Sequence, residues 1–97
     1  MILQILRIQG NSLAPRCSAG DYVLASGLAL RLRPCRAGDL VVFDHPEYGR
    51  LIKFVDHVEE DGCLDLRGLD IDSIDSRLFG TIPPASIGGR VVWHIRA

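Results

Sequence analysis

The chain has 97 residues, of which 47% are hydrophobic and 24% charged, as is typical of one small globular domain. Its formal net charge of −1 excludes the bulk basicity that marks many nucleic-acid-binding domains. No segment reaches the roughly 18 consecutive apolar residues of a membrane span, and residues 1–7 do not form a secretory signal. We therefore expect one domain over residues 1–97, with no nucleic-acid partner and no direct membrane insertion.

Six segments rich in Val, Ile, Leu, Tyr, Phe or Trp predict strands, in the order 2–9, 22–25, 40–43, 51–58, 63–67 and 90–95. Turn signals separate them, at 46–49, 60–62 and 88–89. Asp61-Gly62 favours a hairpin, and Pro83 to Ile87 favours one helical turn. Short strands joined by Gly and Pro turns predict a mainly β fold, either a small folded sheet or a β-barrel.

One short motif occurs twice. Ala-Gly-Asp stands at 19–21 and again at 37–39, each time two residues after a cysteine and two residues before a valine. We expect both copies to form the same turn, in which glycine adopts a positive φ and leads into a strand.

The chain has three cysteines and three histidines, which are Cys17, Cys35, Cys63, His45, His57 and His94. An odd number of cysteines without a C-x-x-C pair argues against a disulfide framework and fits a reducing compartment. We therefore expect a cytoplasmic protein. The cysteines and histidines lack the ligand spacing of a zinc site, so we expect no metal and no cofactor.

Two residues have the chemistry of a nucleophile and its base. Ser12 lies between a Gly-Asn turn and Pro15, which favours a fixed turn, and Lys53 lies inside the apolar run 51–55. To act as a base near pH 7, a lysine must lower its pKa by about 3 units, or about 4 kcal/mol of desolvation. The plain alternatives are an ordinary turn serine and a strand-edge lysine whose ammonium reaches water.

Other chemistry has weaker support. Asp70, Asp72 and Asp75 do not have the spacing of a calcium-binding EF-hand loop, which also requires a glycine and a terminal glutamate. A Ser-His-Asp triad is a rival, but none of the three histidines lies in a serine-hydrolase motif.

Three blocks of the sequence, in their order along the chain, resemble the type I signal peptidase family of serine-lysine proteases. Ser12-Leu13-Ala14-Pro15 is similar to the family's Ser-Met-x-Pro, and Ile52-Lys53-Phe54-Val55 to Ile-Lys-Arg-Val. The third block is similar to Gly-Asp-Asn followed by Asn-Ser-x-Asp-Ser-Arg and Gly; it comprises Gly68-Leu69-Asp70, Asp72-Ser73-Ile74-Asp75-Ser76-Arg77 and Gly80. The chain departs from these patterns at Leu13, Phe54 and Leu69.

The resemblance implies the mainly β core of the signal-peptidase and LexA-like proteases, with Ser12 as nucleophile and Lys53 as general base. It further implies that Ser73 orients the lysine amine and that Asp75 and Arg77 form a structural ion pair. The backbone N–H of Ser12 is then the expected oxyanion donor, because Gly10 stands where some members add a hydroxyl.

An extended substrate is expected to add as a strand near 8–10 or 51–53. The residues that we expect to bind it are Ile8, Gly10, Leu13 and Leu51.

Within the family, the chain is most similar to the small maturation proteases of nickel-type superoxide dismutase. It shares their short spacing between the lysine and Ser-x-Asp-Ser-Arg blocks, and endings like Phe79–Pro83 and Gly89–Trp93. Such a soluble endopeptidase removes an N-terminal leader from its protein substrate, and nickel belongs to that substrate. Eleven residues precede Ser12, so we expect the resemblance to cover the catalytic core without an anchor.

Two alternatives stay open: a general signal peptidase core that acts with a membrane partner, and a non-catalytic β binding module of the same fold. A self-cleaving repressor is less favoured, because no DNA-binding domain precedes Ser12. The sequence leaves the oligomeric state open.

Overall fold

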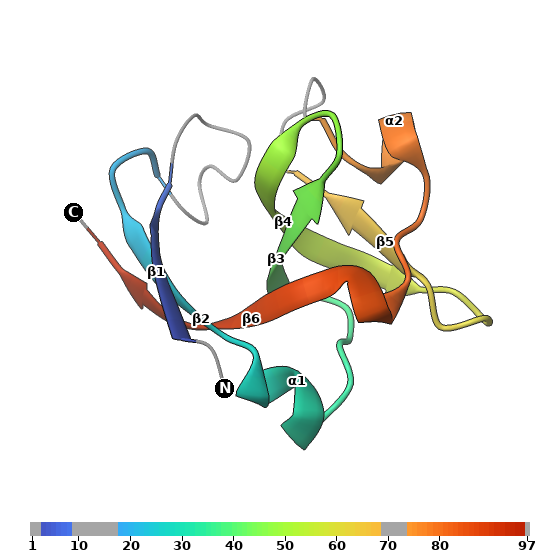
Figure 1. The fold of residues 1–97 in the computed structure, drawn as a ribbon, viewed down its shortest axis with the longest axis horizontal. Coiled ribbons are helices and arrows are strands. Elements are labelled where there is room, and N and C mark those ends of the chain that lie inside the picture. The colour runs from blue at the N-terminus through green and yellow to red at the C-terminus, as the bar shows by residue number, and fades with distance from the viewer. Residues whose placement is uncertain (1–2, 9–17, 69–73, 97) are drawn as a thin grey trace.

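The computed structural model describes residues 3–8, 18–68 and 74–96, which form one antiparallel sheet of six strands (Figure 1). The strands are β1 Leu3–Arg7, β2 Tyr22–Ser26, β3 Leu40–His45, β4 Gly49–Val58, β5 Leu64–Arg67 and β6 Ile87–Ile95. Three short helical segments connect them: α1 Leu28–Leu32, α2 Ser76–Phe79 and the 3₁₀ turn η1 Pro84–Ser86. None of the described helices is long and apolar enough to cross a bilayer.

The strand order is β1-β2-β6-β3-β4-β5, so the last strand of the chain lies in the middle of the sheet (Figure 1). β2 and β3 pair with the two sides of β6, and they pair in turn with β1 and β4. The mainly β prediction is confirmed. Of its two forms, the structure is the folded sheet: β1 and β5 stand at its edges, and it does not close into a barrel.

Each predicted strand corresponds to an observed strand, with ends that differ by a few residues, and a 3₁₀ turn lies within the predicted 83–87 segment. The turn predicted at Gly88-Gly89 is wrong, because both residues lie inside β6. A Cβ at Gly89 would lie 3.4 Å from the Cβ of Ala25, so this glycine permits the close approach of β2. The helix α1 was not predicted; the Ser26 hydroxyl accepts the N–H of Ala29 at its start.

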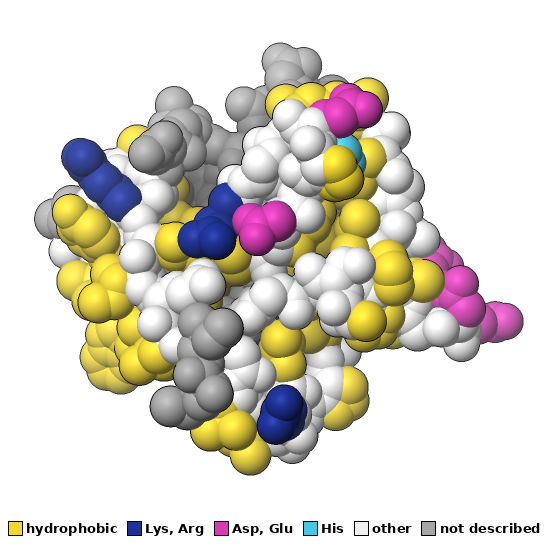
Figure 2. Space-filling model, viewed as in Figure 1, with side chains coloured by type: hydrophobic (Ala, Val, Ile, Leu, Met, Phe, Trp, Pro, Cys, Tyr) yellow, Lys and Arg dark blue, Asp and Glu magenta, His cyan; other side chains and the backbone are white. Residues whose placement is uncertain are grey.

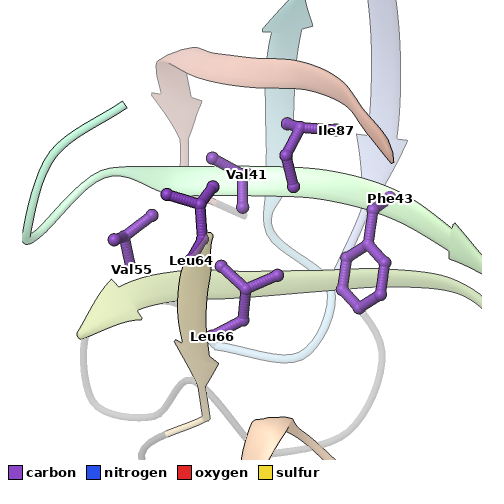
Figure 3. Packing of buried hydrophobic residues seen from close by; sticks show 6 residues of the cluster. All are labelled: Val41, Phe43, Val55, Leu64, Leu66 and Ile87. Carbon is purple, nitrogen blue, oxygen red and sulfur yellow. The ribbon is translucent and has the colours of Figure 1, made fainter. Parts of the chain in front are cut away.

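Successive residues of β3 and β4 point to opposite faces of the sheet and pack in two different apolar clusters. The larger cluster lies where β3, β4, β5 and β6 meet (Figure 3), and its buried members are Val41, Phe43, Val55, Leu64, Leu66 and Ile87. The smaller cluster is centred on Ile8, Val23 and Leu40. Full burial of each such side chain stabilises the fold by about 1.5–3 kcal/mol.

Apolar side chains are spread over much of the face in Figure 2. Apolar side chains are exposed on β1, β2 and β6, and they include Leu3, Ile5, Tyr22, Trp93 and Ile95. Acidic side chains gather at the tip of the hairpin between β4 and β5 (Figure 2), where the predicted Asp61-Gly62 turn lies and Gly62 has a φ of 89°. Both cysteines in the described ranges, Cys35 and Cys63, are free thiols.

The repeated Ala-Gly-Asp motif forms the expected pair of turns. Gly20 and Gly38 both have a φ of 92°, and each turn leads into a strand, β2 or β3. This is the left-handed region, which disfavours residues with a Cβ. Nothing lies within 4 Å of a Cβ built on Gly38, so the constraint there is conformational.

We predict that Gly38→Ala lowers the free energy of unfolding by about 1–2 kcal/mol, because alanine must adopt a left-handed conformation there. Gly27→Ala is the matched control, since Gly27 has an ordinary φ of −70°. Urea unfolding followed by the fluorescence of Trp93, the only tryptophan, measures both variants. Equal effects of the two substitutions would contradict this explanation.

Candidate active site

The structure describes five of the nine residues that the sequence assigns to the site: Ile8, Leu51, Lys53, Asp75 and Arg77. Ser12, Gly10, Leu13 and Ser73 lie outside the described residues. The described geometry therefore concerns Lys53 and its surroundings.

Lys53 lies on β4 and is only 4% exposed. Successive strand residues point to opposite faces, so Lys53 shares its face with Leu51 and Val55, which belong to the larger cluster. Val41 of β3 stands opposite it in the register. Lys53 is therefore not the strand-edge lysine of the plain alternative, whose ammonium would reach water.

Burial lowers the pKa of Lys53, since it removes the charged amine from water. Two charges act in addition: Asp75 raises the pKa of Lys53, and Arg77 lowers it. Desolvation is the largest of the three effects, and the pKa falls below its ordinary value.

Lys53 is also the only lysine in the chain, whose Lys and Arg residues number 11. An arginine stays protonated in proteins, whereas a buried lysine can lose its proton. Among the 11 lysine and arginine residues, only Lys53 can become neutral, and it is buried. The sequence shows that Lys53 is the only lysine, but only the structure shows that it is buried.

The predicted ion pair between Asp75 and Arg77 is present. Asp75 is 0% exposed, and its Oδ2 lies 2.7 Å from a terminal nitrogen of Arg77. The carboxylate also accepts the backbone N–H groups of Gly68 and Arg77, both at 3.0 Å. Burial alone raises the pKa of Asp75, but these hydrogen bonds outweigh it, so the pKa is lowered.

Local contacts explain why this pair lies near Lys53. Asp75 caps the start of α2, and the hydroxyl of Ser76 accepts the N–H of Leu66 at 2.8 Å. These bonds hold α2 against β5, whose residue Leu66 pairs with Val55 of β4. The segment around Asp75 is thereby fixed to the strand that carries the lysine.

The two edges expected to bind substrate differ. Ile8 is buried, and its backbone N–H and C=O are bonded to Asp21 and Gly20 at 2.7 and 2.9 Å. Along β4, the ladder with β3 begins at Gly49, whereas the ladder with β5 begins only at Phe54. Among the described strands, only β3 pairs with the part of β4 around Leu51.

Two histidines contact acidic residues in ways that the sequence did not predict. His94 of β6 places Nε2 2.7 Å from Oδ2 of Asp21, which is 5% exposed. On the β4–β5 hairpin, His57 lies between Asp56 and Glu59, at 2.8 and 2.9 Å. His57, Asp56 and Asp65 place ligand atoms within 4.8 Å of one another, the one such group of possible metal ligands within the described ranges.

No protein-family model matches this chain, and no curated protein matches it either.

Lys53→Met is predicted to raise the free energy of unfolding at pH 7 by about 1–2 kcal/mol, because an apolar side chain replaces a buried amine. The pKa of Lys53 is lowered in the folded state, so the unfolded chain binds more protons between that value and about 10.4. Wild-type stability therefore rises with pH in this window, by at most about 1.4 kcal/mol per pH unit, and the variant lacks the rise.

Urea unfolding at several pH values measures this difference. Arg50→Met is the control, since Arg50 is an exposed cation on the same strand. A Lys53→Met variant that keeps the wild-type pH dependence would show that Lys53 does not titrate abnormally.

Proposed function

We propose that the chain is a serine endopeptidase in which Ser12 is the nucleophile and Lys53 the general base. The observation that carries this proposal is the burial of the only lysine on a core face, with its pKa lowered by desolvation. A general base must be unprotonated at the working pH, and burial favours the neutral amine. The resemblance of the blocks around Ser12, Lys53 and Ser73 to signal peptidases supplies the nucleophile.

The proposed reaction has two stages. Neutral Lys53 accepts the hydroxyl proton of Ser12 while Oγ attacks the scissile carbonyl carbon, and the backbone N–H of Ser12 donates to the oxyanion. The C–N bond then breaks, and the lysine gives its proton to the leaving amine. In the second stage Lys53 takes a proton from water while the water oxygen attacks the acyl carbon. The ester C–O bond then breaks, and the lysine returns the proton to Oγ of Ser12. Ser73 is proposed to orient the amine of Lys53.

Arg77 has an electrostatic role in this proposal. A buried carboxylate beside an amine favours the charged amine, which is why Asp75 raises the pKa of Lys53. Arg77 binds that carboxylate and itself lowers the pKa of Lys53. Asp75 thus holds its loop while Arg77 offsets the effect of the Asp75 carboxylate on the pKa of Lys53.

We propose that the substrate binds in an extended form beside Leu51, where β4 pairs with β3 and has not yet begun its ladder with β5. Such a strand would lie next to Lys53. The proposed substrate is a protein with an N-terminal leader, and the resemblance favours the precursor of nickel-type superoxide dismutase. The proposed location is the cytoplasm, and nickel is part of the substrate.

The two alternatives have distinct experimental signatures. A signal peptidase core that acts with a membrane partner would fractionate with membranes when that partner is present. A non-catalytic β module would fail to react with a serine-directed acylating probe at any pH. Reaction of Ser12 with the probe supports the proposed function.

Lys53→Arg is predicted to be as inactive as Lys53→Ala, since a guanidinium does not lose its proton in a protein. Ser12→Ala sets the background rate, about 10³-fold or more below wild type. Cleavage of a leader-bearing precursor, resolved by mass spectrometry, measures all three variants. Activity in Lys53→Arg would contradict the general-base role, and wild-type activity in Ser12→Ala would contradict the nucleophile.

Arg77→Met is predicted to move the rising limb of kcat/KM to higher pH. Without the guanidinium, Asp75 acts on Lys53 unopposed, so the pKa of the lysine rises and less neutral base is present at a given pH. Arg67→Met is the matched control, because Arg67 binds Asp65 instead. A limb that stays in place, or moves to lower pH, would contradict the electrostatic role of Arg77.

A further inference from the structure

The two Ala-Gly-Asp turns have the same internal hydrogen bonds. In each, the aspartate N–H donates to the carbonyl three residues earlier, at 3.0 Å for Asp21 and 3.1 Å for Asp39. Each aspartate side chain accepts the backbone N–H of that same earlier residue, Ser18 at 3.1 Å and Arg36 at 3.0 Å. The turns are therefore two copies of one structure, and their differences can be compared directly.

Each turn also binds one residue of a neighbouring segment through two backbone bonds. Gly20 and Asp21 bind Ile8, at 2.9 and 2.7 Å, as Gly38 and Asp39 bind Val55, at 2.8 and 2.7 Å. Val55 lies within β4, whereas Ile8 directly precedes the segment 9–17 and Ser18 directly follows it. The first turn thus holds the residues at both ends of the segment that contains Ser12.

The side chain that binds the aspartate differs between the two copies. Asp39 receives two hydrogen bonds from Arg33, at 2.9 and 3.0 Å, and Arg33 is only six residues away in the chain. Asp21 instead contacts His94, 73 residues away on β6, the central strand. Asp21 is 5% exposed, so loss of this partner would leave a buried carboxylate with one fewer hydrogen bond.

We propose that His94 is a positioning residue for the nucleophile. Through Asp21 it fixes Ile8 and Ser18, the described residues on either side of 9–17, relative to the sheet that carries Lys53. The inference rests on the proposed function for the role of Ser12, but the contact that it invokes does not. His94 acts here as a hydrogen-bond donor, so glutamine, which can donate but cannot serve as a base, is expected to replace it.

Amide hydrogen exchange tests the contact without reference to activity. In His94→Leu, the amides of Ile8 and Gly20 are expected to exchange about tenfold faster or more, the effect of losing one charge-assisted hydrogen bond. Those of Gly38 and Val55 should keep their wild-type rates. Arg33→Leu is the matched control in the second turn and should show the reverse pattern. Unchanged exchange at Ile8 and Gly20 in His94→Leu would overturn the proposal.

Acylation of Ser12 by a phosphonate probe, followed by intact-protein mass, tests the consequence. His94→Leu should acylate about tenfold more slowly, in proportion to the loosening of the turn, and His94→Gln should restore both acylation and slow exchange. If His94→Gln kept slow exchange but lost acylation, His94 would be a base and the positioning role would be overturned.

Failure of the proposed function has a separate signature. If the wild-type protein were not acylated at Ser12, the nucleophile and its positioning would both be overturned. The exchange rates of Ile8 and Gly20 would still decide whether His94 holds the turn. Circular dichroism of each variant establishes that it is folded, and His94→Gln provides a second variant if His94→Leu is not.

Discussion

The removal of the Lys53 amine from water is the constraint on which this account depends. A lysine in water is protonated at neutral pH, and only desolvation or a neighbouring positive charge makes it a base. The sheet buries Lys53 by placing it on a core face between Leu51 and Val55, and this burial lowers its pKa. Burial of an amine there costs stability, as is common at functional sites, where local rules of folding are broken for chemistry.

The surroundings of Lys53 show how the same contacts serve the fold and the electrostatics. The buried Asp75 holds the loop before α2 through the backbone of Gly68, and α2 is fixed to β5 by Ser76. A bare carboxylate in that position would favour a charged lysine, and Arg77 offsets it. The proposed chemistry therefore depends on an ion pair that would otherwise be classed as structural.

The features that could be predicted from sequence are those set by local residue preferences. Strands formed where β-branched and aromatic residues cluster, the hairpin formed at Asp61-Gly62, and the two Ala-Gly-Asp motifs gave the same turn. The family resemblance led to the Asp75–Arg77 pair, which the structure contains.

The remaining features depend on contacts between distant parts of the chain. Gly88-Gly89 reads locally as a turn, but the approach of β2 to Gly89 makes it part of a strand. The bond between Asp21 and His94 joins residues 73 apart, which no local pattern reveals. The burial of Lys53 depends on tertiary packing, because both faces of the run 51–55 carry apolar residues and each face packs against a different cluster.

Direct titration of Lys53 tests the central claim. Because the chain has one lysine, protein labelled with ¹³C-lysine gives a single Cε signal, and its chemical shift against pH reports one pKa. We expect a wild-type midpoint clearly below the ordinary value of about 10.4. In Arg77→Met the midpoint should be higher than in the wild type, but still below the value of an unfolded chain. A wild-type midpoint at or above 10.4 would contradict the account, since Lys53 would then be an ordinary charged lysine.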